Sequence, residues 1–353
     1  MTYRVVQWST GNVGMFALRS IIEHPDLELV GLLVHSQAKA GQDAGALCGA
    51  APTGVIATND ADEVLALKPD VVCYTATGDL RPHEAVEDMC RILESGANVV
   101  SSSVVSLVYP PAADKAFVAQ LQAACDKGGT SCFTSGIDPG FGNDLMPLTL
   151  TGFAQRIDAV RVMEILNYDT YDQPTVLFDT MGFGSRPEET PLLLMPGVLT
   201  LAWGSVVHMI AAGLGVELDE VRERFERWES DRKFETPGGV IEEGTMAGLR
   251  FEVIGVVNGR EAIVVEHVTR MRDDAAPDWP QPAGQGSYRI VIEGNPKMKC
   301  ELELVGEGGD HNAGGVLATA TRIVNAIPAV VAASPGLLSP LDLPLVTGKH
   351  LLS

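Results

Sequence analysis

The chain has 353 residues, of which 46% are hydrophobic, and 46 acidic side chains outnumber 25 basic ones for a net charge of -21. This length supports two ordinary cores, and the negative charge repels phosphate backbones and anionic lipid, so we expect no nucleic acid and no membrane among its partners. The chain opens on a strand-like segment without a leader, has no C-x-x-C pair among its 6 cysteines and lacks a long apolar run, which together predict a cytoplasmic protein with reduced thiols.

Residues 1–150 consist of short apolar runs that alternate with amphipathic segments. The first run is "YRVVQW", residues 3–8, and the last is "TSCFTSGI", residues 130–137, with helical patterns between successive runs. Strands that alternate with helices in this way form parallel sheets, so we expect an α/β fold with a Rossmann-type parallel sheet. Residues 1–150 are therefore the predicted dinucleotide-binding domain.

Longer β-like runs joined by hairpin-type turns follow over residues 151–310. They predict an α+β domain with a mostly antiparallel sheet, which we expect to hold the substrate and to form a dimer. Within this domain, the apolar residues 196–215 predict a buried helix, and the charged residues 217–228 predict a second helix. Residues 311–353 predict a C-terminal helix and a tail that pack back on the first domain.

The first strand runs into "STGNVG", residues 9–14, where the first helix begins. In a dinucleotide fold, one glycine of this turn lies where the backbone meets the pyrophosphate and another where the helix meets the sheet. Gly11 and Gly14 have that spacing, with Ser9 in place of the first glycine of G-x-G-x-x-G. A tight turn without a ligand is the alternative, but the position between strand and helix favours a dinucleotide. The predicted cofactor loop comprises Ser9, Thr10, Gly11, Asn12, Val13 and Gly14.

The end of the second strand bears on the identity of the cofactor. An NAD-binding fold usually offers an Asp or Glu here to the ribose 2′-hydroxyl, whereas this chain offers His35, Ser36 and Lys39, with no acid before Asp43. A hydroxyl and an ammonium group can bind a 2′-phosphate, so NADP is favoured over NAD, although Lys39 could also be an ordinary solvated lysine. Further cofactor contacts are expected where neighbouring strands end, at Ala76, Thr77, Ser101, Ser102 and Pro139.

Four segments together resemble one family over nearly the whole chain. They are "STGNVG", "LLVHSQAKAGQDAG", "GIDPGFGNDLMPL" and "VNAIPAVVAASPGLLSPLDLP". The chain resembles oxidoreductases with a dihydrodipicolinate reductase N-terminal domain, close to the native NADP-dependent amine dehydrogenases and to 2,4-diaminopentanoate dehydrogenase. The resemblance implies an enzyme that transfers a hydride between NADPH and an imine or carbonyl carbon, in the reductive amination of hydrophobic ketones or aldehydes.

The chain departs from this family pattern at two places. Dihydrodipicolinate reductases carry a His-His-x-x-Lys stretch for their dicarboxylate substrate, but the corresponding residues 162–175 read "VMEILNYDTYDQPT", so a role in lysine biosynthesis is not expected. In the amine dehydrogenases a Glu acts as acid and base shortly after the strand that ends "NVVS". Val104 and Val105 stand there in this chain, and a valine cannot move a proton.

The missing Glu leaves three functions open. In an amine dehydrogenase another group must activate ammonia, and the candidate catalytic residues are Tyr168, Glu164 and Asp138. Each also has an ordinary structural interpretation, since Glu164 could face solvent, Tyr168 could line a wall, and Asp138 could start a turn. A carbonyl reductase or alcohol dehydrogenase that works without ammonia is the first alternative. A non-catalytic NADP-binding sensor is the second.

The segment "GIDPGFGND", residues 136–144, turns directly after a predicted parallel strand, at the edge where such sheets bind ligands. The resemblance implies that this loop passes beside the nicotinamide, where we favour a positioning role for Asp138 over catalysis. No metal is expected, because no His, Cys or Asp cluster has ligand spacing. A hydrophobic carbonyl or amine substrate and a homodimer through the open sheet are the expected partners. The predicted substrate pocket comprises Phe141, Met146, Tyr171, Phe178, Trp203 and His208.

Overall fold

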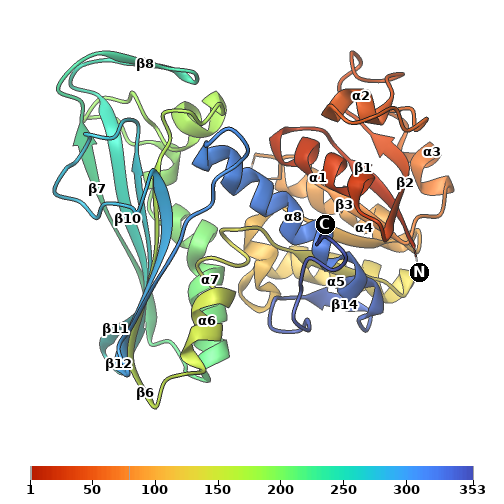
Figure 1. Ribbon diagram of the computed structural model, residues 1–353. Coiled ribbons are helices and arrows are strands. Elements are labelled where there is room, and N and C mark those ends of the chain that lie inside the picture. Colours follow the sequence, from red (N-terminus) through yellow and green to blue (C-terminus); the bar gives the residue numbers. More distant parts are fainter. Residues whose placement is uncertain (1, 79, 353) are drawn as a thin grey trace. The chain divides into compact units, whose positions relative to one another are not determined.

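The computed structural model describes residues 2–78 and 80–352, which divide into two compact units (Figure 1). The N-terminal unit contains residues 1–140 and 316–353, and the C-terminal unit contains residues 141–315. Each unit has a sheet and a hydrophobic core of its own. The first unit therefore takes up the end of the chain as well as its beginning.

Among the described residues, the sheet of the N-terminal unit has six strands in the order β14-β5-β4-β3-β1-β2, and all neighbours are parallel. The strands are apolar and buried on both faces, as in parallel sheets that are covered by helices on both sides. The predicted Rossmann-type sheet is confirmed. Its strands are β1 (Tyr3–Trp8), β2 (Leu27–Leu33), β3 (Val71–Tyr74), β4 (Asn98–Ser101), β5 (Ser131–Thr134) and β14 (Gly336–Leu338).

Helices form a layer on each face of this sheet. One core joins the sheet to α4 and α5, and another joins it to α1 and α8. Successive strand residues enter different cores, as Val71 and Val72 do, because side chains alternate along a strand. The helices are α1 (Asn12–Glu23), α2 (Ala44–Cys48), α3 (Ala61–Ala66), α4 (Pro82–Glu94), α5 (Lys115–Gly128) and, from Val316 on, α8 (His311–Ala332), with short 3₁₀ turns η1 (Val105–Val108) and η2 (Pro110–Ala112).

Helix α8 is long and apolar enough to cross a membrane by length and composition alone, with a mean hydropathy of 1.5. One such helix is weak evidence, because a core helix of a soluble protein passes the same test. One face of α8 lies in the core of the N-terminal unit against α1 and the sheet. This face comprises Ala320, Ile323, Val324, Ile327 and Val330.

The cysteines are free thiols throughout the described chain. Cys73, Cys125 and Cys132 are buried in the N-terminal unit, and burial raises the pKa of the Cys125 thiol to about 12. A buried thiol that keeps its proton is a poor nucleophile, so these cysteines act as core residues.

The sheet of the C-terminal unit has the strand order β13-β12-β6-β11-β10-β7 and is mixed, since β6 and β11 pair in parallel and the other neighbours are antiparallel. This confirms the mostly antiparallel sheet. One face packs on α7, the apolar helix expected over residues 196–215. The elements are α6 (Leu145–Thr151), β6 (Arg156–Asn167), η3 (Thr175–Thr180), η4 (Leu192–Leu194), α7 (Val198–Leu214), β7 (Glu220–Glu229), β8 (Phe234–Thr236), β9 (Gly239–Ile241), β10 (Met246–Val257), β11 (Arg260–Arg270), β12 (Gly286–Asn295) and β13 (Met298–Leu302).

The charged helix predicted for residues 217–228 is wrong, because this segment forms the strand β7. Opposite charges three and four residues apart fit a helix, but they also alternate along a strand. In the sheet, Arg224 of β7 lies opposite Glu252 of β10 and pairs with it. Cross-strand pairing therefore outweighs helix propensity, and the charges suit a strand at the edge of a sheet.

Candidate functional site

The loop between β1 and α1 contains two glycines, and at one of them, Gly14, the structure leaves no space for a side chain. A Cβ on Gly14 would lie 2.5 Å from the carbonyl oxygen of Ser9 and 2.6 Å from Oγ1 of Thr75. A Cβ on Gly11 would meet nothing within 4 Å, so Gly11 borders open space. Gly14 thus lets the helix pack closely on the sheet, and Gly11 leaves the outer side of the loop clear.

Ser9 adopts the backbone conformation of the glycine that it replaces, with a φ of 80°. Two buried polar residues hold it there. Gln7 donates from Nε2 to the Ser9 carbonyl at 2.8 Å and to Oγ1 of Thr75 at 2.8 Å, and the Thr75 hydroxyl donates to the Trp8 carbonyl at 3.1 Å. Sequence reasoning missed Gln7 and Thr75. A glutamine within an otherwise apolar run was the available signal.

The N-terminus of α1 directs backbone amide donors toward the glycine-rich loop, where they can bind an anion. Gly11 is its N-cap and supplies no side chain, and its first turn contains no acidic residue. The first amides of a helix have no partner within the helix, so they bind phosphate well. With the open side of Gly11, this arrangement fits the pyrophosphate of a dinucleotide, and Asn12 and Val13 lie in the first turn.

Lys39 reaches back from the end of β2 to the glycine-rich loop. Its Nζ lies 2.8 Å from the Thr10 carbonyl oxygen and 3.1 Å from the Thr10 hydroxyl, while His35 and Ser36 are exposed. Asp43, the nearest acid after β2, binds backbone amides of its own loop. Its carboxylate accepts from the amides of Thr53, Gly54, Gly45 and Ala46, which hold its pKa below the ordinary value.

The ends of β3 and β4 are joined by serine hydrogen bonds. The Ser101 hydroxyl accepts from the Ser103 amide at 2.9 Å, and the Ser103 hydroxyl donates to the Ala76 carbonyl. Ser101 and Ala76 are buried, whereas Thr77 is exposed and Ser102 is half-buried. Of the polar residues predicted at these strand ends, Thr77 and Ser102 are therefore the more accessible.

Val104, which stands near the expected Glu, is buried and has a φ of 55°. This left-handed conformation is unusual for a β-branched residue. Tight packing against Gly78 accompanies it, because a Cβ on Gly78 would lie 2.7 Å from the Val104 amide nitrogen. Val105 begins the turn η1, so neither Val104 nor Val105 supplies a carboxylate in place of the missing Glu.

The loop after β5 carries Asp138 and Pro139 in the N-terminal unit. Gly140 closes the loop with a φ of 128°, and a Cβ there would lie 2.3 Å from the Gly136 amide nitrogen. The Ser135 hydroxyl donates to the Gly140 carbonyl at 3.1 Å. This packing fixes the turn that carries Asp138, which is half-buried.

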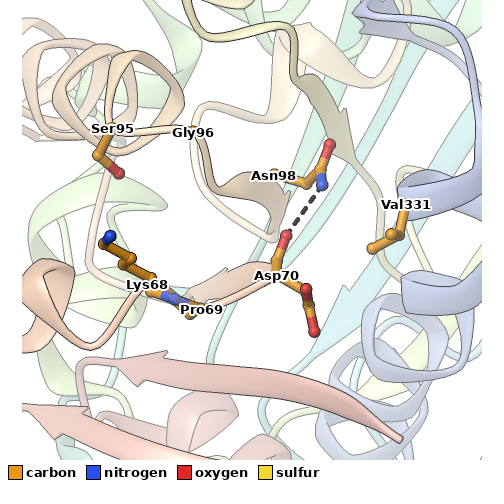
Figure 2. Close-up of a pocket in the computed structure, with 7 residues that line it drawn as sticks. All are labelled: Lys68, Pro69, Asp70, Ser95, Gly96, Asn98 and Val331. Atoms are coloured by element: carbon orange, nitrogen blue, oxygen red, sulfur yellow. Dashed lines mark hydrogen bonds between the residues drawn. The ribbon is translucent and has the colours of Figure 1, made fainter. Parts of the chain in front are cut away.

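A pocket of about 460 Å³ lies at the opposite edge of the same sheet, where β3 and β4 begin (Figure 2). In it, the Asn98 side chain donates to the Asp70 carbonyl at 2.9 Å. Parallel sheets bind ligands at the carboxyl ends of their strands, so we do not take this pocket as the cofactor site. Its lining residues are Lys68, Pro69, Asp70, Ser95, Gly96, Asn98 and Val331.

In the C-terminal unit, four side chains form one row across four adjacent strands. Phe251 lies opposite His267, His267 opposite Glu164, and Glu164 opposite Tyr288, on β10, β11, β6 and β12. All four side chains are buried. Directly opposite residues of neighbouring strands are the closest side-chain pairs of a sheet, so strand pairing sets this row.

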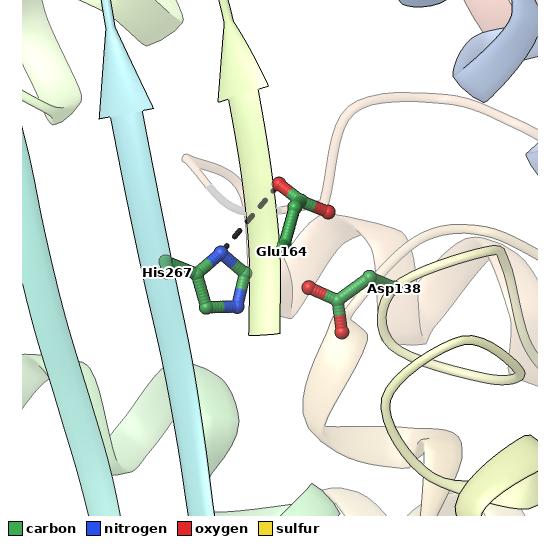
Figure 3. A group of neighbouring side chains, drawn as sticks. All are labelled: Asp138, Glu164 and His267. Atoms are coloured by element: carbon green, nitrogen blue, oxygen red, sulfur yellow. Dashed lines mark ion pairs between the residues drawn. The ribbon is translucent and has the colours of Figure 1, made fainter. Parts of the chain in front are cut away.

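Glu164 is 7% exposed, which rules out the interpretation that it faces solvent. Its Oε1 accepts from the Tyr168 hydroxyl at 3.2 Å. The same oxygen lies 3.5 Å from Nδ1 of His267, the ion pair that Figure 3 shows. Sequence reasoning missed His267 altogether. Of the predicted catalytic carboxylates, Asp138 belongs to the N-terminal unit, and Glu164 is the one within the row of four buried side chains.

Aromatic side chains lie beside the pair of Glu164 and His267. The rings of Phe251 and Trp203 each lie 4.6 Å from the His267 ring, and the rings of Tyr168 and Tyr171 lie 4.7 Å apart. Of the predicted pocket, Met146, Tyr171, Phe178 and Trp203 pack against the core of this unit and Phe141 is half-buried, but His208 is exposed on α7.

Comparison with known proteins identifies relatives of the whole chain. The family model for the 2,4-diaminopentanoate dehydrogenase C-terminal domain matches residues 141–350. An amine dehydrogenase of Streptomyces virginiae is 44% identical over 344 residues, 96% of either chain. The 2,4-diaminopentanoate dehydrogenase of Acetoanaerobium sticklandii is 25% identical over 267 residues, 74% of this chain and 70% of its own. The structure of amine dehydrogenase from Mycobacterium smegmatis superposes with a TM-score of 0.80 at 22% identity, over 98% of this chain and 97% of its own, and shows the same fold.

Proposed function

Since the chain belongs to the family of amine dehydrogenases and 2,4-diaminopentanoate dehydrogenases, which are nicotinamide-dependent oxidoreductases, we propose that it reductively aminates a hydrophobic ketone or aldehyde with NADPH. The buried carboxylate of Glu164 carries this proposal. It supplies a proton-transferring group in a chain that has Val104 and Val105 where the amine dehydrogenase pattern has a Glu. The aromatic side chains around it suit a hydrophobic substrate.

In this mechanism, one carbonyl compound, one ammonium ion and one NADPH give one amine, one water and one NADP⁺. When bound, the reduced nicotinamide supplies the hydride to the substrate carbon. Glu164 takes a proton from the ammonium ion, which frees the nitrogen lone pair to attack the carbonyl carbon. The added nitrogen passes one of its protons to the former carbonyl oxygen, and the carboxyl group returns the proton that it took, so that this oxygen leaves as water.

The test follows NADPH absorbance with a panel of aliphatic and aromatic ketones and aldehydes, with and without a high concentration of ammonium at mildly alkaline pH. We expect oxidation that requires ammonium. Oxidation without ammonium would instead identify a carbonyl reductase. Tight NADPH binding without any oxidation would favour a sensor.

NADP(H) is the proposed cofactor, because Lys39 is the cation beside the glycine-rich loop and Asp43 is bound to backbone amides. A Lys39→Ala substitution should raise the KM for NADPH by about 10- to 100-fold, since a hydrogen bond to a charged group is worth about 1.5–3 kcal/mol, and leave the KM for NADH nearly unchanged. Steady-state kinetics with both cofactors measures this. The matched control is Lys115→Ala, at an exposed lysine of the same unit.

An equal rise in KM for NADPH and NADH would contradict this assignment. It would show that Lys39 acts by holding Thr10 and the loop, not by binding the 2′-phosphate.

The protein is also proposed to be a homodimer that associates through the open face of its second sheet. On the face away from α7, Arg161 pairs with Glu252 and Glu266, Arg224 pairs with Glu252, and Arg250 pairs with Glu266. A face of alternating charges can be complementary to itself across a two-fold axis. Light scattering should give about twice the chain mass of 37.5 kDa, and a monomer mass would contradict the proposal.

A further inference from the structure

His267 is placed by the sheet so that its ring meets the carboxylate of Glu164. The two residues lie directly opposite each other on β11 and β6, and Nδ1 of His267 is 3.5 Å from Oε1 of Glu164. Both belong to the C-terminal unit, and His267 is 3% exposed. A titratable pair is thus buried within the core face of a sheet, where an unpaired charge would be costly.

Two aromatic rings fix the plane of the His267 imidazole. The Phe251 ring stacks on it with an interplanar angle of 7° and a centroid distance of 4.6 Å. The Trp203 ring lies 4.6 Å away at 57°. The Phe251 and Trp203 rings also contact each other, with centroids 4.7 Å apart, so the three rings pack as one group. The imidazole cannot turn Nδ1 away from Glu164 without disturbing this packing, so the core sets the direction of this nitrogen.

The Tyr168 hydroxyl donates to the same oxygen of Glu164 at 3.2 Å. Both neighbours therefore act on Oε1. Among the residues that the structure describes, Oε2 makes no hydrogen bond, and this oxygen is not fully buried. The carboxylate is anchored through one oxygen, and the other remains open to a ligand.

We propose that His267 is a positioning residue for Glu164: with Tyr168 it anchors Oε1, so that Oε2 faces the substrate nitrogen. This role rests on the proposed function, in which Glu164 exchanges protons with ammonia. It assigns the buried His267 the task of orienting the Glu164 carboxylate. It also explains how a strand residue can replace an acid that the family pattern has on a loop.

Two substitutions in the full-length enzyme distinguish the effect of the His267 N–H group from the effect of its ring. His267→Phe keeps an aromatic ring against Phe251 and Trp203 but has no donor, and His267→Asn keeps an N–H near the position of Nδ1. We expect His267→Phe to lower kcat by about 10- to 100-fold, as loss of an orienting partner does, with the KM for NADPH unchanged. His267→Asn should recover most of this loss.

A spectroscopic measurement tests the pair without turnover. The chain has 7 histidines, and the ring nitrogen signals that disappear from the ¹⁵N spectrum of His267→Asn belong to His267. Glu164→Gln should shift these signals. The control Glu307→Gln, at an exposed glutamate, should leave them in place.

The proposal is overturned if the His267 signals do not move in Glu164→Gln, or if His267→Phe and His267→Asn have the same kcat. Failure of the proposed function gives a different result, because the wild-type enzyme would then show no ammonium-dependent turnover while the ¹⁵N spectra still report on the pair.

Discussion

Glu164→Gln should lower kcat for ammonium-dependent NADPH oxidation by about 10²–10⁴-fold, the usual contribution of a positioned acid or base. Glutamine has the same shape as glutamate, and its amide oxygen can still accept from the Tyr168 hydroxyl, but it cannot take a proton from ammonium. The KM for NADPH should stay unchanged, because Glu164 lies in the C-terminal unit and the phosphate loop in the other. Steady-state kinetics at saturating ketone and ammonium measures both constants.

Asp169→Asn is the matched control. Asp169 follows the same strand, and burial, with a smaller effect of the Asp273 carboxylate, raises its pKa. Asp169 has no role in the proposed mechanism, so the substitution should leave kcat near the wild-type value. A Glu164→Gln enzyme with full activity would contradict the assignment. Asp138→Asn would then be the next variant to test.

Alternation along β6 could have identified Glu164 as buried from the sequence. In "RIDAVRVMEILN", Glu164 is in phase with Val160 and Val162, which face the core. His267 is likewise in phase with Ile263 and Val265 on β11. A period of two places each residue on the core face, but it does not show that the two strands are neighbours.

The N-terminal unit was easier to predict than the C-terminal unit, for a physical reason. Parallel strands are buried on both faces and alternate with helices, so each strand is a continuous apolar run with a helix after it. The partners in the mixed sheet depend on which strands meet, as the parallel pairing of β11 with β6 shows. The β7 segment was misassigned because its charges satisfy the helical and the extended period equally, and contacts with β10 decide between them.

Some details of the cofactor loop could likewise be predicted from the sequence, and others could not. The spacing of Gly11 and Gly14 was sufficient to predict the loop, because a local turn is encoded locally. The hydrogen bonds that hold Ser9 were not predictable, since Thr75 directly follows β3 and reaches the loop only in the folded sheet. Lys39 was expected near the cofactor, but its contact with Thr10 depends on the fold of the turn after β2.

Gly14→Ala should abolish tight NADPH binding and destabilise the fold. The new Cβ would lie 2.5 Å from the Ser9 carbonyl oxygen and 2.6 Å from Oγ1 of Thr75, so α1 or the loop must move. Forcing an extra methyl group into a packed site costs about 1–3 kcal/mol of stability, and the moved loop no longer presents its amides to the pyrophosphate. Thermal melting measures the stability, and fluorescence titration with NADPH measures the binding.

Gly11→Ala separates these two effects. A Cβ at this position meets nothing within 4 Å and the φ of -72° suits any residue, so the melting temperature should match that of the wild type. NADPH binding should nevertheless weaken, because the methyl group would enter the space in which the pyrophosphate is expected. Wild-type affinity in Gly11→Ala would mean that the phosphates do not pass over this glycine. Loss of binding in both variants, with loss of stability in Gly14→Ala alone, is the result expected of a dinucleotide loop in which one glycine serves the ligand and the other serves the packing.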